Sequence, residues 1–82
     1  MKLFKVEGQK PVAYDEFRSM VCAAESEDDA RALCPKDGFG EMDDNESYLY
    51  WGCPLSGLTV TYIGEAAEGI EEGVICADFN AG

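Results

Sequence analysis

The sequence predicts an α+β fold: a small two-layer domain in which one short helix covers an antiparallel sheet of four to five strands. The chain has 82 residues, which is the length of one small domain, residues 1–82. Apolar residues make up 46% of it and aromatic residues 11%, which is more than a disordered acidic chain carries. Segments rich in β-branched and aromatic residues flank a single strong helix signal, so we expect the order β-β-α-β-β-β.

Two strands are predicted before the helix. Residues 2–7 form the first, and the segment 8–11 ends it because it contains a glycine and a proline. Residues 14–24 form the second strand. Neither of its faces is cleanly polar, so we expect this strand to lie inside the sheet rather than at an edge.

The clearest helix signal lies at residues 26–34. Ser26 is a favourable N-cap, Asp29 stands three residues later in the capping-box position, and Pro35 stops the helix. The acidic residues of the first turn are stabilised by the helix dipole, so we do not count them as a binding site. They are Glu27, Asp28 and Asp29. The apolar positions expected to face the sheet are Ala30, Leu33 and Cys34.

The second half of the chain is predicted to add two or three strands. A long polar connection at 36–47 leads to a short aromatic strand at 48–51. Residues 58–65 form a strong strand of β-branched and aromatic residues. An acidic turn at 66–73 then leads to the last strand at 74–79.

The distribution of charge is the main indication of function. The net charge is -11, and all six basic residues lie in the first 36 positions, whereas residues 37–82 hold ten acidic residues and no Lys or Arg. Such a surface repels nucleic acids and anionic membranes and attracts basic protein surfaces. Solubility alone is an alternative reason for this acidity.

Several functional classes are disfavoured. The chain has no histidine, so Ser/His/Asp and Cys/His catalytic sets are excluded, and we expect neither an enzyme nor a cofactor. No apolar run reaches the length of about 18 to 20 residues that spans a bilayer, and charged residues interrupt the N-terminal segment where a signal peptide would be apolar. We therefore expect a cytoplasmic protein.

The cysteines and the acidic connection are the candidate metal ligands of this chain. Cys22, Cys34, Cys53 and Cys76 are widely and irregularly spaced, so we expect buried, reduced thiols rather than a zinc site or disulfides. Residues 37–46 are rich in carboxylates, and calcium binding there is an alternative, but the EF-hand pattern is absent. We expect no metal site.

A folded domain with a continuous row of carboxylates can imitate the phosphates of a nucleic acid. Phosphates repeat about every 3.4 Å along each DNA strand, and side chains on one face of a β-strand repeat about every 6.6 to 7 Å, with loops supplying intermediate spacings. Aromatic side chains beside the acids would anchor the partner. The candidate partner-binding residues are Glu41, Asp43, Asp44, Glu46, Glu65, Glu68, Glu71, Glu72, Tyr48 and Tyr50. For Trp51, core packing is the favoured interpretation.

Two segments resemble a group of short, uncharacterised phage and prophage proteins. One is the run AAESEDDARALCP at residues 23–35, and the other is IGEA at 63–66 followed by the tail EGVICADFNAG at 72–82. Cys34 stands where the group has histidine. The resemblance implies an accessory phage protein acting in a bacterial host cell. By analogy of class, such proteins include anti-defence factors such as anti-CRISPR proteins.

These observations combine into one leading hypothesis. We expect a non-enzymatic, phage-type inhibitor that acts as an acidic DNA mimic on the basic surface of a host nucleic-acid-handling protein, such as a CRISPR effector complex. The alternative is an acidic interaction or dimerisation domain with no inhibitory role. Direct binding to nucleic acid or membrane is not expected.

Overall fold

The computed structural model describes residues 1–9 and 16–80, and within them the chain forms four strands, two α-helices and one 3-10 turn. In chain order they are β1 (Lys2–Glu7), β2 (Glu16–Ala24), α1 (Glu27–Ala32), α2 (Asp44–Trp51), the 3-10 turn η1 (Leu55–Gly57), β3 (Thr59–Glu65) and β4 (Gly73–Asn80).

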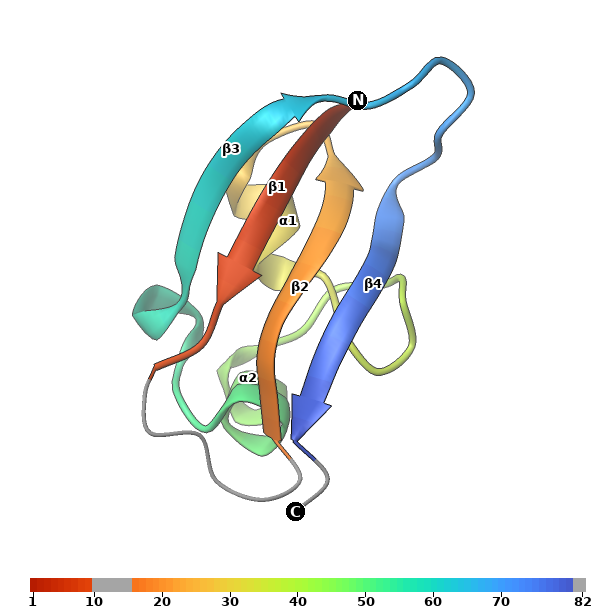
Figure 1. Ribbon diagram of the computed structural model, residues 1–82. Coiled ribbons are helices and arrows are strands. Elements are labelled where there is room, and N and C mark those ends of the chain that lie inside the picture. The colour runs from red at the N-terminus through yellow and green to blue at the C-terminus, as the bar shows by residue number, and fades with distance from the viewer. Residues whose placement is uncertain (10–15, 81–82) are drawn as a thin grey trace.

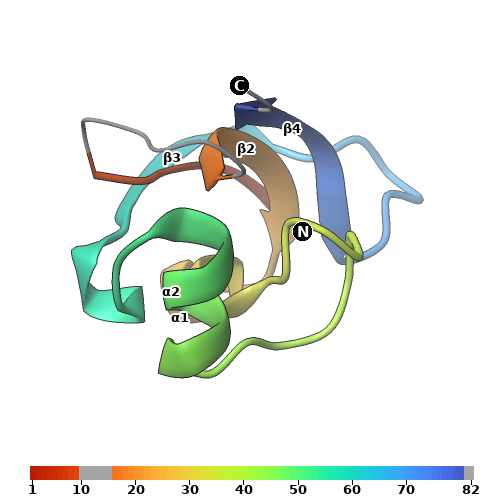
Figure 2. The same ribbon diagram turned by 90° about the horizontal axis from the view of Figure 1, so that it is seen from below.

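The four strands form one antiparallel sheet in the order β3-β1-β2-β4. Both helices lie on the same face of this sheet, behind it in Figure 1, and the view from below shows the curved sheet on one side and the helices on the other (Figure 2). The predicted α+β architecture is confirmed. Within residues 1–9 and 16–80, no helix covers the opposite face of the sheet.

The core forms between the helices and the inner face of the two central strands. Phe4 pairs with Cys22 and Val6 pairs with Met20, and all four side chains are buried. Their spacing of two residues along each strand is the period that places side chains on one face. The predicted interior position of the second strand is confirmed, because β2 lies between β1 and β4. Residues 14–15, which we assigned to this strand, lie outside the described residues.

The helix predicted at 26–34 is present as α1 and is shorter. The Ser26 side chain accepts a hydrogen bond from the Asp29 amide at 3.2 Å, as the capping motif predicts. The helix ends at Ala32 because Leu33 adopts an extended conformation and forms a β-bridge with Glu41. The positions predicted to face the sheet, Ala30, Leu33 and Cys34, are buried.

The prediction of a strand at 48–51 is wrong, since these residues form the second half of α2. The buried residues of α2, Ser47 and Trp51, stand four positions apart, which is helical spacing rather than strand alternation. Asp43 caps the start of the helix. Gly52 ends it in the left-handed conformation, with φ 76°, which glycine adopts without strain.

Trp51 is a core residue, as predicted. Its side chain is 2% exposed and packs against Phe17, with ring centroids 6.0 Å apart. The interpretation of the cysteines as buried thiols holds for three of them, because Cys22, Cys34 and Cys53 are buried and all four are free. It is wrong for Cys76, which is exposed on the edge strand β4.

Candidate functional site

Most of the first group of predicted partner-binding residues belong to one structural unit, α2 and its cap. Asp44, Glu46, Tyr48 and Tyr50 lie on the helix and Asp43 is its N-cap, whereas Glu41 precedes it in the bridge to α1. The connection that the sequence predicts at 36–47 is therefore partly helical.

The carboxylates of this unit are engaged in local hydrogen bonds. The Glu46 amide donates to Asp43 Oδ1 at 2.9 Å, and the Asp43 amide donates to Glu46 Oε1 at 3.4 Å, which completes a capping box. Asp44 Oδ1 accepts a hydrogen bond from the Leu55 amide at 3.0 Å and so fixes the chain after the helix. These three acids have structural roles that account for their presence at the start of a helix.

The two tyrosines of α2 have different environments. Tyr50 is half-buried and packs edge-on against Phe17, whereas the side chain of Tyr48 is 55% exposed. Leu49, between them, is 64% exposed. Tyr48 therefore remains available to a partner, and Tyr50 contributes mainly to packing.

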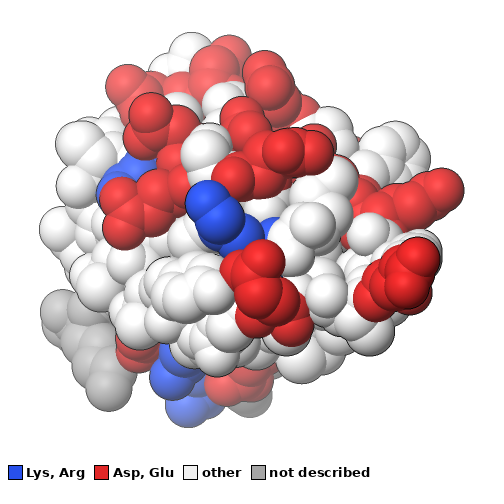
Figure 3. Space-filling view, turned by 90° about the horizontal axis from the view of Figure 1, so that it is seen from above, with Lys and Arg blue, Asp and Glu red and all other residues white. Residues whose placement is uncertain are grey.

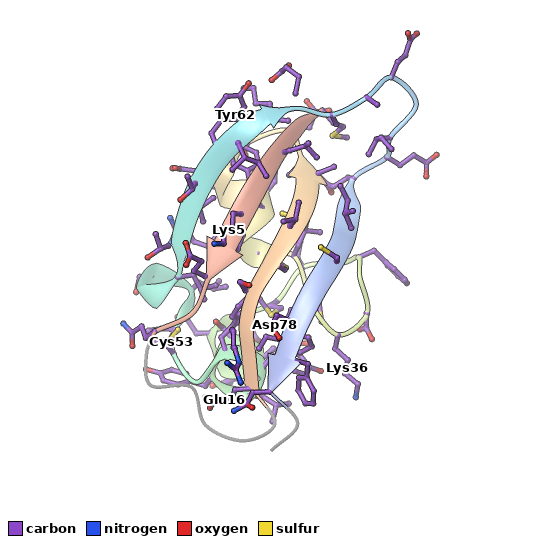
Figure 4. All side chains as sticks on the ribbon, viewed as in Figure 1. Lys5, Glu16, Lys36, Cys53, Tyr62 and Asp78 are labelled. Atoms are coloured by element: carbon purple, nitrogen blue, oxygen red, sulfur yellow. The ribbon has the colours of Figure 1, made fainter. Side chains whose placement is uncertain are left out.

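An apolar groove of about 500 Å³ lies between α2 and β4. Phe17 stands between two of its walls, with its ring centroid 4.8 Å from that of Phe79 and 6.4 Å from that of Tyr50. Lys36 is the charged residue among the lining side chains, and Figure 4 shows it beside the lower end of β4. The lining residues are Phe17, Pro35, Lys36, Leu49, Tyr50 and Phe79. No local pattern in the sequence predicts this groove, because its described lining residues come from four separate segments.

The second group of predicted residues lies in the connection between β3 and β4, at the upper end of the molecule in Figure 1. Glu65 ends β3, and Glu68, Glu71 and Glu72 follow it with exposed side chains. Helix α2 lies at the lower end (Figure 1). The structure therefore separates the two predicted acidic groups rather than joining them into one row.

A different acidic segment joins the second group. Lys2 of β1 pairs with Ala24 at the end of β2 and with Glu65 at the end of β3. The residues that follow both strands therefore leave the sheet at the same end. We name this surface the acidic end and define it by its exposed carboxylates: Glu25, Glu27, Asp28, Glu65, Glu68, Glu71 and Glu72. Seen from this side, acidic atoms spread over the molecule with few Lys or Arg atoms among them (Figure 3).

Three of these carboxylates were missed as site residues. In the sequence, Glu27 and Asp28 are explained by the helix dipole alone, and no local signal marks Glu25. The missing information was that β2 and β3 both pair antiparallel with β1, because this pairing places the ends of the two strands at the same end of the sheet.

The carboxylates of the acidic end differ from those of α2 in their hydrogen bonds: none is held by a backbone amide among the described residues. Glu65 accepts a hydrogen bond from the Tyr62 hydroxyl at 2.6 Å. Among the described residues, the two ion pairs are Lys5–Glu7 and Arg18–Asp78, and neither involves the acidic end. A shallow groove of about 390 Å³ at this end is lined by Lys2, Phe4, Ser26, Glu27 and Tyr62.

Burial and nearby acids raise the pKa values of three side chains: Cys22, Cys53 and Tyr62. Burial, with a smaller effect of the Glu72 charge, raises the pKa of the Cys22 thiol to about 11. The hydrogen bond to Glu65 is the main cause that raises the pKa of Tyr62. Burial raises the pKa of Cys53, partly offset by a backbone hydrogen bond from Gln9. All three effects keep these groups in their neutral forms.

The described residues offer neither a metal site nor a membrane span. They contain no cluster of three or more Cys, Asp or Glu side chains arranged to hold a metal ion. They also contain no helix that is long and apolar enough to span a membrane.

Comparison with known proteins gave no relative. The chain matches no protein-family model, no curated protein and no solved structure.

Proposed function

We propose that this chain is a non-enzymatic binding protein whose acidic end docks on a basic, nucleic-acid-binding surface of another protein. The observation that carries the proposal is the meeting of carboxylates from two distant segments, 25–28 and 65–72, at one end of the sheet. Like charges gathered in this way destabilise the folded chain through mutual repulsion. A partner with Lys and Arg at matching positions relieves that repulsion.

The bonding of the carboxylates supports the choice of this end over α2. The acids at the start of α2 are held by backbone amides, so their hydrogen-bonding capacity is partly used within the chain. Glu68, Glu71 and Glu72 are exposed and take part in no hydrogen bond or ion pair among the described residues. Ile70, among them, is 42% exposed and supplies an apolar contact within the charged surface.

The narrower proposal is an inhibitor that competes with nucleic acid. A rigid surface of carboxylates attracts the same Lys/Arg groove that binds phosphates, and electrostatic attraction makes its association fast and sensitive to salt. The resemblance of the helix and tail segments to phage and prophage proteins supports an anti-defence role of the anti-CRISPR type. A CRISPR effector complex is therefore the first partner to test.

The test measures binding of the purified chain to purified CRISPR effector complexes, with and without DNA, at several salt concentrations. Two variants with the same change of charge are compared: Glu68→Gln with Glu71→Gln at the acidic end, and Asp37→Asn with Glu41→Gln in the connection before α2. We expect the first pair to weaken binding and flatten its salt dependence, and the second pair to have little effect. Equal effects of the two pairs, or binding that salt leaves unchanged, would contradict the proposal.

The second candidate function is an acidic interaction domain with no inhibitory role, in which the apolar groove beside α2 is the contact. The exposed side chains of Leu49 and Phe79 beside a half-buried tyrosine favour it, because apolar and aromatic residues dominate the centres of protein interfaces. Binding through this groove would be insensitive to salt and would be lost in Leu49→Asp.

A further inference from the structure

The sheet face opposite α1 and α2, which no helix of the described residues covers, has a regular composition. Residue pairing places its side chains in three rows across β3, β1, β2 and β4, and we name these twelve positions the open face. The rows are Gly64, Leu3, Ala23, Gly73; then Thr61, Lys5, Val21, Cys76; then Thr59, Glu7, Ser19, Asp78. Most of these side chains are small, so another sheet can approach the backbone of the open face closely.

The open face is electrically neutral although the chain carries -11. Its charged side chains are Lys5, Glu7 and Asp78, together with Arg18, which pairs with Asp78 from a bulge in β2. Both ion pairs of the described residues lie here: Lys5–Glu7 at 3.7 Å and Arg18–Asp78 at 3.9 Å. Figure 4 shows Lys5 on β1 and Asp78 on β4, in the view that faces this surface. Two positive and two negative charges cancel, so the rest of the chain carries the whole net charge.

Glu16, an acid at the start of β2, is turned toward the helical layer. Glu16 begins β2, and its carboxylate lies against Gly52 in the helical layer, where a Cβ on that glycine would meet the Glu16 oxygens at 2.6 Å or less. Glu16 therefore adds no negative charge to the open face at the start of β2.

We propose that the open face packs against the same face of a second copy of this chain, giving a two-fold symmetric dimer. In such an interface each patch must complement itself, so it needs either no charge or equal numbers of opposite charges. The open face meets this condition, and the acidic end does not. The ion pairs are partly exposed, with side chains 39% to 61% accessible, so each charged group can also face an opposite charge of the other copy.

Apolar burial supplies the attraction. Leu3 and Val21 are only half-buried in the single chain. The register shifts leave Ile63 and Ile75 as extra residues in the edge strands, and their side chains are 50% and 53% exposed. A second sheet packed at about 10 Å would cover Leu3 and Val21.

The area of the open face sets the expected strength of the dimer. Four strands at about 4.8 Å and some six residues at about 3.3 Å cover roughly 400 Å², so two copies bury about 800 to 1,000 Å². Stable interfaces bury about 1,200 to 2,000 Å². We therefore expect a weak dimer that forms and dissociates with concentration.

Dimerisation through the open face does not depend on the proposed docking of the acidic end. The two kinds of binding respond differently to salt. Added salt screens the repulsion between two chains of charge -11, so dimerisation strengthens or stays constant as salt rises. Docking of the acidic end on a basic partner weakens under the same conditions.

Sedimentation equilibrium of the full chain tests the proposal, with loading concentrations from about 10 μM to about 1 mM at low and high salt. We expect the average mass to rise toward that of a dimer. A chain that stays monomeric over this range at both salt concentrations overturns the proposal.

Matched variants then locate the contact. Val21→Lys places a charge at the centre of the open face, and Ala77→Lys places the same charge on the same sheet at an exposed position that pairs with Met20 of the inner face. Both variants reduce the net negative charge from -11 to -10. A loss of the dimer in Val21→Lys therefore cannot come from increased overall repulsion. We expect Val21→Lys to be monomeric and Ala77→Lys to dimerise as the wild type does.

A second variant is included in case Val21→Lys does not fold. Thr61→Lys changes an already exposed side chain in the same row as Val21, so it tests the open face without touching the core. Circular dichroism identifies the variants that keep the fold. If a folded Val21→Lys or Thr61→Lys dimerises as strongly as the wild type, the dimer uses another surface and the proposal is wrong.

Discussion

Raising the pH from 8 to 11 should destabilise this protein through one buried thiol. Cys22 lies in the core with 0% exposure, and its pKa is raised from 9.0 to about 11, mainly by burial. The unfolded thiol ionises near pH 9, whereas the folded thiol stays protonated until about pH 11. Between these values the unfolded state binds fewer protons, so the free energy of unfolding falls as pH rises.

The magnitude follows from the size of the shift. A pKa difference of about two units corresponds to about 3 kcal/mol, which is fully present below pH 9 and fully lost above pH 11. At pH 10, midway between the two values, about 1.4 kcal/mol has been lost. Such a loss is large against the total of roughly 5 to 15 kcal/mol for a typical domain.

Other groups also titrate in this range, so the assay compares the wild type with Cys22→Ala. Urea unfolding at pH 8, 9, 10 and 11 under reducing conditions gives the difference in free energy of unfolding at each pH. The alanine variant loses core packing at every pH but lacks the ionising thiol. We expect its deficit at pH 8 to shrink by about 1.4 kcal/mol at pH 10 and by about 2 kcal/mol at pH 11.

Cys76→Ala is the matched control, because the thiol of Cys76 is exposed. A constant difference between the wild type and Cys22→Ala from pH 8 to pH 11 would refute the reasoning, since it would mean that the folded environment leaves this thiol unperturbed.

Three further predictions concern the helix caps and the acidic end. Asp43→Ala should lower the free energy of unfolding by about 1 kcal/mol in urea denaturation, because the α2 capping box is lost. Ser26→Ala should cost a similar amount, about 1 kcal/mol, whereas Ser56→Ala, at an exposed position, should change stability by less than about 0.5 kcal/mol. Glu65→Gln should lower the pKa of Tyr62 in an ultraviolet titration, because the charged acceptor of its hydroxyl is removed. An unchanged titration would mean that the 2.6 Å hydrogen bond does not form in solution.

The strands and the first helix could be predicted because their signals are local. Ser26 and Pro35 mark the limits of a helix within a few residues of each other, and alternation along 2–7 marks a strand. The second helix was missed for a physical reason. Its aromatic residues have strand propensity, and that weak preference was given more weight than the Asp43–Glu46 capping pair, which is present in the sequence.

The arrangement of the candidate site could not be predicted from local signals. Residues 25–28 and 65–72 are far apart in the chain, and only the pairing of Lys2 with both strand ends brings them together. The presence of Asp and Glu in the sequence does not distinguish carboxylates that cap a helix from those that stay free of hydrogen bonds to the backbone. That distinction depends on which backbone amides lie within hydrogen-bonding distance, as for the amide of Leu55 beside Asp44.

The neutral open face and the acidic end also constrain each other. If two copies meet through their open faces, the carboxylates that extend beyond the strand ends stay outside the contact, because the interface rows end at Leu3 and Gly64. A dimer would then present two acidic ends to a partner, and two linked contacts bind more tightly than one when the partner's basic sites match their spacing. Val21→Lys should in that case weaken binding to an extended basic partner without altering the acidic end itself. Equal binding by the monomeric variant would show that one acidic end is sufficient.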